Sequence, residues 1–145
     1  LIPGLEQARF LRYGQVHRNS YVLAPAVLRA DLSLRAQPRT LVAGQLCGTE
    51  GYVEAIATGY LAGVFAAGLS RGEAQSPPPR ATAMGSLLHY ITHSSLQHYA
   101  PANMTLDLLP ALESAPRDRE LRRRQQCRRA LAAHQVWLEA QPVPA

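Results

Sequence analysis

The sequence predicts an α/β fold with short strands and about three helices. The first observation behind this class is the apolar run at 40–43, which ends at Gly44 in the manner of a short buried strand. The second is a glycine-punctuated turn that leads from this run into a long segment of small and apolar residues reaching about Leu69. The third is the helical spacing of apolar residues in 82–95 and 117–139.

Two short extended pieces precede the strand and the glycine turn. They are 9–13 and 20–23, and the polar turn 17–19 separates them. Their aromatic and β-branched residues favour strands.

The helix after the glycine turn carries apolar residues on all of its sides. A helix with this pattern is expected to be buried all round. Gly59 and Gly63 lie four positions apart on one of its faces and would let a strand or a ligand approach the backbone closely. Each glycine costs about 1 kcal/mol relative to Ala, so a packing reason is expected.

A stiff proline run at 76–79 divides the chain, and we expect a boundary between 1–75 and 76–145. The helix predicted at 82–95 has Leu87, Leu88 and Ile91 as its apolar face. The last helix is basic in its first half, and Trp137 is expected to anchor its second half. The packing stripe predicted for this helix is Cys127, Leu131, His134 and Leu138.

Composition excludes several classes of protein. No apolar run reaches the 18 or more positions of a membrane span, so we expect no membrane partner. Cys47 and Cys127 lie eighty positions apart without zinc-site spacing, which predicts no disulfide framework and a cytoplasmic setting. The first residues have no signal-peptide features and do not begin with Met, so a chain cut from a longer protein is expected.

The positive charge is concentrated in one segment. All fifteen basic residues are Arg, and seven of them fall between Arg117 and Arg129 against only two acids, which accounts for the whole formal net charge of +5. Two interpretations stay open: a patch that neutralises RNA phosphates, or a solvated helix face.

The glycine turn carries the strongest chemical signal. The first N–H groups of a helix lack partners and carry a partial positive charge, so they attract anions. Gly44, Gly48 and Gly51 remove side chains that would keep a flat or charged ligand away. Their spacing is not that of the dinucleotide fingerprint, so the turn alone is consistent with a phosphate or cofactor site and equally with a plain tight turn.

The string 43–63 is similar to the second FAD-contacting motif of the TrmFO and GidA (MnmG) tRNA-modifying flavoproteins. The stretches 2–19 and 79–92 resemble TrmFO in particular. Glu50 and Val53 stand where GidA more usually carries Thr and Glu, which favours the TrmFO branch.

This resemblance implies a fold and a cofactor. Residues 1–75 would be the carboxy-terminal part of a two-dinucleotide-binding-type FAD domain, and 76–145 a helical extension packed on it. The helix dipole would face the flavin and stabilise the negative charge of its reduced form. The cofactor-binding residues would be Gly44, Gln45, Gly48, Glu50, Gly51, Tyr52 and Val53.

The resemblance also implies an activity. It is flavin-dependent methylation of a T-loop uridine in tRNA to 5-methyluridine, with methylenetetrahydrofolate and NAD(P)H as co-substrates. The family's fingerprint glycines and nucleophilic cysteine would lie in a missing amino-terminal part, so this chain alone is expected to be inactive and its catalytic residues are unknown. The alternatives are a GidA-type enzyme of the wobble uridine and a stand-alone basic RNA-binding or interaction module.

The substrate-contacting candidates implied by the resemblance fall in two groups. They are His17, Arg18 and Asn19, and Arg122, Arg123 and Arg124. For His17 two roles stay open, contact with folate or flavin and a hydrogen bond that stabilises its turn. The family's Pro-Met-Asn stretch is altered here at 101–107, so the substrate side of the pocket is expected to differ.

Three smaller expectations concern the histidine pair, two glutamates and the exposed surface. His89 and His93 are four positions apart but lack a third ligand, so no metal site is predicted. Glu50 and Glu54 share a helix face and either raise each other's pKa or simply favour the helix start. If much of the protein is missing, exposed apolar surface and weak stability are expected.

Overall fold

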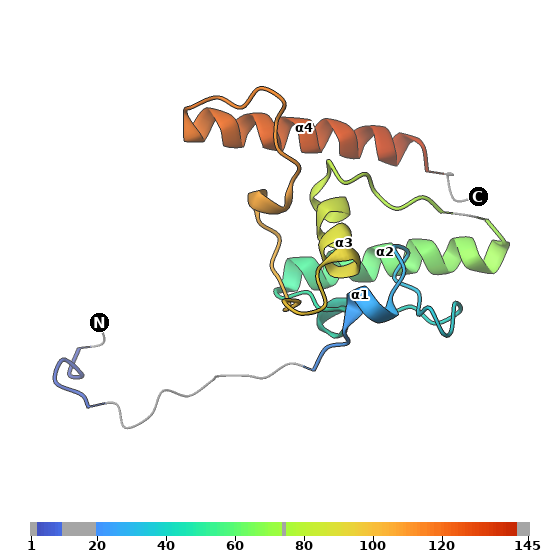
Figure 1. Cartoon of the computed structure of the whole chain (residues 1–145), viewed down its shortest axis with the longest axis horizontal. Coiled ribbons are helices and arrows are strands. Elements are labelled where there is room, and N and C mark those ends of the chain that lie inside the picture. Colours follow the sequence, from blue (N-terminus) through green and yellow to red (C-terminus); the bar gives the residue numbers. More distant parts are fainter. Residues whose placement is uncertain (1–2, 10–19, 74, 142–145) are drawn as a thin grey trace.

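The computed structural model describes residues 3–9, 20–73 and 75–141, and this part of the chain is mostly helical. The described residues include three long helices, as predicted, and α3 (Ala83–His93) lies between α2 (Tyr52–Arg71) and α4 (Arg119–Glu139) in Figure 1. The helical elements in chain order are α1 (Ala24–Val27), the 3-10 turn η1 (Gly44–Cys47), α2 (Tyr52–Arg71), α3 (Ala83–His93), the 3-10 turn η2 (Leu106–Leu108) and α4 (Arg119–Glu139).

The predicted strands are the main departure. Within the described residues the β-pairing is limited to isolated bridges, Leu28 with Leu34, Ser33 with Leu41 and Thr49 with Ala102. The run at 40–43 is extended but pairs only with the turn before it, where Val42 N donates to Leu32 O at 3.0 Å. A strand in a sheet needs hydrogen-bonded neighbours along its edges. Within the described residues this run has one such neighbour, the short turn before it. The α/β class is therefore not confirmed.

The two other predicted strands, 9–13 and 20–23, form no sheet within the described residues. Residues 20–23 form no strand; Val22 N donates to Leu46 O at 2.9 Å instead. Most of 9–13 lies outside the described residues.

Helix α2 forms where it was predicted. Its N-cap is Gly51 with φ 90°, and it ends at Gly72, whose φ of 70° is the left-handed conformation that commonly terminates helices. The N–H of Gly72 donates to the carbonyls of Gly68 and Leu69, which satisfies the end of the helix. Glycines at both ends therefore fix its length.

The predicted burial of α2 on all sides is wrong within the described residues. Only Thr58, Leu61, Phe65 and Gly68 are buried, all on the side that faces the rest of the chain. No element of the described residues covers the opposite side. The large apolar residues exposed on α2 are Tyr52 (91%), Val53 (76%), Ile56 (72%), Tyr60 (54%) and Leu69 (41%). We call the first four of them, with Gly59 and Gly63, the outer face of α2.

Gly59 and Gly63 lie open on that outer face. A Cβ added at either would meet no atom within 4 Å, so the close approach predicted from their spacing is not made by the described residues. By length and composition α2 also meets the requirements of a membrane-crossing helix, a test that core helices of soluble proteins pass as well. The apolar residues of α2 do not form an unbroken run, because Glu, Thr, Gly and Ser residues interrupt them.

Helix α3 is packed as predicted. The side chain of Thr82 caps it by accepting the N–H of Gly85 at 2.9 Å, and Leu87, Leu88 and Ile91 are buried. Gly85 meets the proline run, because a Cβ there would overlap the carbonyl oxygens of Pro78 and Pro79. The core around α3 comprises Ala24, Leu28, Leu32, Val42, Cys47, Leu61, Phe65, Leu88, Ile91, Tyr99 and Trp137.

Helix α4 is anchored by polar contacts that its apolar pattern does not encode. Trp137 is 5% exposed and its Nε1–H donates to Ser76 O at 3.0 Å, so the predicted anchor is confirmed. Arg129 donates to the carbonyls of Ala111 and Pro110. These contacts fix which side of the helix faces inward.

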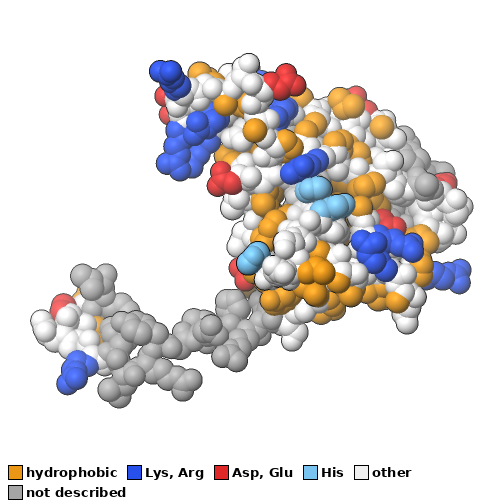
Figure 2. Space-filling model, in the orientation of Figure 1, with side chains coloured by type: hydrophobic (Ala, Val, Ile, Leu, Met, Phe, Trp, Pro, Cys, Tyr) orange, Lys and Arg blue, Asp and Glu red, His pale blue; other side chains and the backbone are white. Residues whose placement is uncertain are grey.

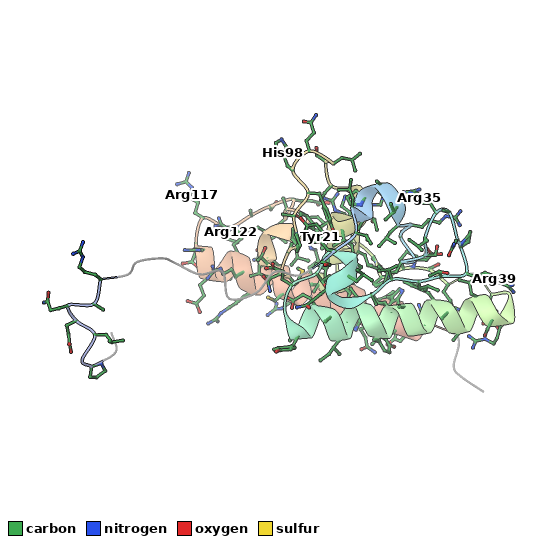
Figure 3. The ribbon with its side chains drawn as sticks, turned by 90° about the horizontal axis from the view of Figure 1, so that it is seen from below. Tyr21, Arg35, Arg39, His98, Arg117 and Arg122 are labelled. Atoms are coloured by element: carbon green, nitrogen blue, oxygen red, sulfur yellow. The ribbon has the colours of Figure 1, made fainter. Side chains whose placement is uncertain are left out.

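The packing stripe predicted for α4 is therefore wrong. Cys127 is exposed, and so are Leu131 (69%) and Leu138 (40%); His134 alone is partly covered, with its ring 5.6 Å from that of Trp137. The basic half of α4 is exposed at its amino end, where Figure 2 shows basic side chains gathered and Figure 3 labels Arg117 and Arg122.

Candidate functional site

The turn before α2 requires its glycines for conformational reasons. Gly44, Gly48 and Gly51 have φ values of 65°, 92° and 90°, a region that residues with a side chain rarely adopt. The backbone conformation of the turn thus explains the glycine spacing, whether or not a ligand lies beside the turn.

Two threonines fix this turn on the helix. Gly44 N donates to Thr58 Oγ1 at 2.9 Å, and Thr58 Oγ1 donates in turn to Glu54 O at 2.8 Å. Thr49 Oγ1 donates to Gly44 O at 2.9 Å. Both threonines are 1% exposed. Sequence reasoning missed them, although Thr58 stands out as a polar residue within an apolar helix.

Gly48 faces protein and is not among the residues that line the hollow described below. A Cβ on Gly48 would overlap the hydroxyl of Tyr99, which donates to Cys47 O at 3.1 Å. Burial raises the pKa of Tyr99, so the phenol stays protonated and keeps donating. Tyr99 therefore supports the turn from beneath.

Cys47 is a structural thiol. It is fully buried, and its Sγ donates to Gly44 O at 3.1 Å. Burial is the largest influence on its pKa and raises it, which disfavours the thiolate a nucleophile needs.

The altered stretch 101–107 crosses the start of α2. Glu50 N donates to Ala102 O at 3.0 Å, and Ala102 N donates to Gly48 O at 3.2 Å. Asn103 Nδ2 donates to Glu50 O at 3.1 Å. The Glu54 carboxylate accepts the N–H of Met104 at 2.8 Å, so its role within the chain is to hold this crossing segment.

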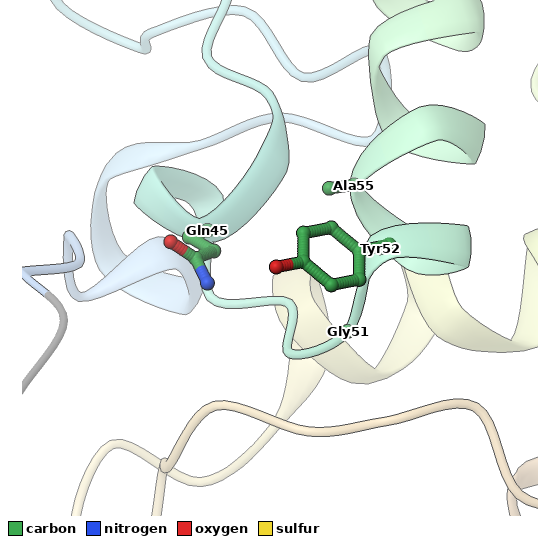
Figure 4. A pocket seen from close by; sticks show the side chains of 4 residues that line it. All are labelled: Gln45, Gly51, Tyr52 and Ala55. Atoms are coloured by element: carbon green, nitrogen blue, oxygen red, sulfur yellow. The ribbon is translucent and has the colours of Figure 1, made fainter. Parts of the chain in front are cut away.

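A hollow of about 460 Å³ opens at the start of α2, lined by Gln45, Gly51, Tyr52 and Ala55. Figure 4 shows the Gln45 amide and the Tyr52 ring pointing toward one another across it. No side chain of the described residues caps the first turn of α2. The hollow thus lies beside the helix start, where the Glu54 carboxylate and the Asn103 amide occupy the space that a Cβ on Gly51 would take.

The structure brings together three of the predicted cofactor residues, Gln45, Gly51 and Tyr52. Val53 lines a separate, smaller hollow of about 90 Å³ with Met84 and other residues. Gly44, Gly48 and Glu50 belong to the same turn but do not line the larger hollow.

The predicted substrate residues lie elsewhere. His17, Arg18 and Asn19 fall outside the described residues. Arg122, Arg123 and Arg124 are on α4, which α3 separates from α2 in Figure 1. Arg122 donates to Pro116 O at 3.5 Å and Arg124 pairs with Glu120, an exposed contact that adds little stability.

His89 and His93 stack with their ring centroids 4.5 Å apart. In the part of the chain that the structure describes, no group of three or more His, Cys, Asp or Glu side chains is placed to hold a metal ion.

Comparisons with known proteins identify the family of this chain. The sequence model of the family described as Glucose inhibited division protein A matches residues 1–74, about half of the chain. The chain therefore belongs to the Glucose inhibited division protein A family.

Within that family the chain is similar to proteins named methylenetetrahydrofolate–tRNA-(uracil-5-)-methyltransferase TrmFO. The Solibacter usitatus protein is 56% identical over 97% of this chain and 31% of its own length. The Koribacter versatilis protein is 49% identical over 95% and 32%, and the Desulforamulus reducens protein 42% identical over 98% and 32%. The chain thus spans about a third of the length of these relatives.

Proposed function

We propose that this chain is the carboxy-terminal part of a flavin- and folate-dependent tRNA uracil-5-methyltransferase. The observation that carries the proposal is the hollow beside the glycine-framed start of α2 at Gln45, in a chain similar to TrmFO proteins three times its length. Residues 1–75 would complete the FAD domain and 76–145 would be its helical extension. The end of the family match at residue 74 supports this boundary.

The residues at the hollow fit one edge of FAD. Gln45 offers an amide that both donates and accepts hydrogen bonds, and Tyr52 offers a flat ring. The first N–H groups of α2 and its dipole stabilise negative charge on an electron-rich ring. FAD supplies the electrons that turn a transferred methylene group into a methyl group. Gly44, Gly48, Glu50 and Val53 would shape this edge through the backbone.

The outer face of α2 would be covered by the missing amino-terminal part. Tyr52, Val53 and Ile56 are more than two-thirds exposed, which is unfavourable for a contiguous apolar surface left in water. Protein, not a membrane, is the proposed cover, since the relatives supply about twice as much additional chain. The extended run at 40–43 would then gain strand partners, which would give the α/β fold of the whole domain.

The remaining roles follow from the same proposal. Methylenetetrahydrofolate would supply the carbon and NAD(P)H the reducing equivalents, in the cytoplasm. The tRNA would contact His17, Arg18 and Asn19 and the basic half of α4, where Arg123 is exposed and has no ion-pair partner among the described residues.

The test uses the full-length gene product whose reading frame contains this chain. We expect the purified protein to carry oxidised flavin, seen by its absorbance, and tRNA from a deletion strain to lack 5-methyluridine. Loss of a wobble-uridine modification instead would assign the GidA-type activity. A colourless protein and unchanged tRNA would leave the RNA-binding module as the better account and refute the enzyme.

A variant ties the result to the hollow. Gln45→Ala in the full-length protein is expected to release flavin more readily, because a hydrogen-bonding group at the cofactor edge is lost. Gln97→Ala, at an exposed loop position, is the matched control and should retain flavin like the unaltered protein. Equal flavin content in the two variants would move the cofactor away from this hollow.

A further inference from the structure

A second hollow, of about 250 Å³, lies beside α3 and has no part in the proposed flavin site. Its chemically active side chains come from three places: Arg80 before the helix, His89, Tyr90, His93 and Ser94 from α3 and its end, and Asp107 from η2. Figure 2 shows two adjoining His side chains with a basic side chain beside them on its visible face.

Arg80 brings a charged head group without a protein partner. Its own carbonyl is held by the buried Ser86, whose Oγ donates to it at 2.5 Å. The guanidinium, by contrast, takes part in no hydrogen bond or ion pair among the described residues. The backbone at this position is therefore anchored, while five N–H donors remain available to a ligand.

Hydrogen bonds set the orientation of His93. Thr92 Oγ1 donates to Leu88 O at 2.6 Å, which uses the only hydroxyl hydrogen. The contact of 2.8 Å between Thr92 Oγ1 and His93 Nδ1 then requires the imidazole to donate through Nδ1. Nε2 is left with a lone pair when His93 is neutral, and it becomes a donor on protonation.

His89 lies beside His93 and within the influence of the charge of Arg80. Its ring is nearly parallel to that of His93, with 14° between the planes. Burial, then the charge of Arg80 and that of His93, lowers the pKa of His89, so the free site disfavours a second cation. The Tyr90 hydroxyl donates to Ala100 O at 3.0 Å. Asp107, which is exposed, is the one carboxylate among the residues that line the hollow.

We propose that Arg80, His89 and His93 form a binding site for a phosphate group. An arginine fork and two imidazoles supply donors to several oxygens of one tetrahedral anion, and the anion would relieve the repulsion among the three groups. A metal ion is the weaker fit, because the guanidinium would repel it.

The phosphate would belong to the RNA backbone, an assignment that rests on the proposed function. The face drawn in Figure 2 carries a pair of His side chains as well as the basic side chains at the amino end of α4, so a strand that crosses this face would pass both. The phosphate site itself stands on its own geometry.

Binding should be linked to proton uptake. The negative charge favours the protonated imidazoles, so affinity for a phosphodiester is expected to rise as the pH falls through the range in which His titrates. The other charged or titratable groups that line the hollow are Arg80, Tyr90 and Asp107.

The test measures tRNA affinity of the full-length protein over a series of salt concentrations. Arg80→Gln is expected to weaken binding several-fold and to reduce the slope of log affinity against log salt by about one, the loss of one phosphate contact. His89→Gln with His93→Gln should remove the rise in affinity at low pH. Arg39→Gln and His98→Gln are the matched controls, because both positions are exposed and neither lines the hollow. Both controls should behave like the unaltered protein.

A titration with inorganic phosphate tests the phosphate site independently of the proposal that the phosphate belongs to RNA. In the same protein, NMR signals of His89 and His93 should shift on addition of phosphate, those of His98 should not, and Arg80→Gln should abolish the shifts. Phosphate-dependent shifts without a change in tRNA affinity would overturn the RNA assignment. Absence of both effects would overturn the site. Phosphate binding in a full-length protein that lacks flavin and methylation would uphold the site and refute the proposed function.

Discussion

Helices α2 and α3 are both built of small and apolar residues, yet only one of them is buried by this chain. In α3, six of eleven residues are buried, whereas in α2 only four of twenty are. The difference is not one of composition, because α2 is the longer and equally apolar helix. Among the described residues, α3 has partners for its buried face, whereas α2 has partners on one side only.

The glycines of the two helices differ in the same way. Gly85 of α3 lies against the carbonyls of Pro78 and Pro79, while Gly59 and Gly63 of α2 face open space. Each glycine costs a helix about 1 kcal/mol relative to Ala, and a neighbour outside the described residues would account for the open glycines of α2.

The largest expected effect separates the two helices at matched isoleucines. Ile91→Ala, at a residue with no exposed surface, should lower the free energy of unfolding of the 145-residue chain by about 2–5 kcal/mol. Ile56→Ala on the outer face of α2 is the control and should change it by less than about 0.5 kcal/mol. Urea unfolding followed by circular dichroism measures both, and equal losses would mean that α2 is packed as fully as α3.

A smaller effect is expected at the glycines. Gly85→Ala should cost about 1–3 kcal/mol, because the new methyl group meets rigid backbone oxygens. Gly63→Ala should instead stabilise the 145-residue chain by about 1 kcal/mol, since it raises helix propensity without a clash. The two melting temperatures should move in opposite directions; a shared direction would contradict the contrast between the helices.

Local patterns predicted the helices, but not all of the surfaces they bury. The apolar spacing of α3 identified Leu87, Leu88 and Ile91 because their packing partners are among the described residues. In α4 the stripe through Leu131 failed, because contacts of Arg129 and Trp137 with distant carbonyls set the rotation of the helix. The strand at 40–43 is not confirmed, because its pairing depends on neighbours that a local pattern cannot reveal.

In the candidate site, too, local patterns predicted some residues, and contacts between distant parts of the chain determined the others. Glycine spacing and resemblance located the turn, and Gln45, Gly51 and Tyr52 do line its hollow. The supports from Thr58 and Tyr99 depend on contacts across 14 and 52 positions, which no local motif contains. The second hollow was visible in the sequence only as a histidine pair, because Arg80 and Asp107 join it through the fold.

The central claim is that the outer face of α2 is an internal surface of a larger protein. The most direct test places a charge there, with Ile56→Lys made both in the 145-residue chain and in the full-length protein. The account predicts little change in the stability of the short chain, where Ile56 is 72% exposed, and a loss of several kcal/mol with release of flavin in the long one. Full-length protein that tolerates the lysine and keeps its flavin would contradict it.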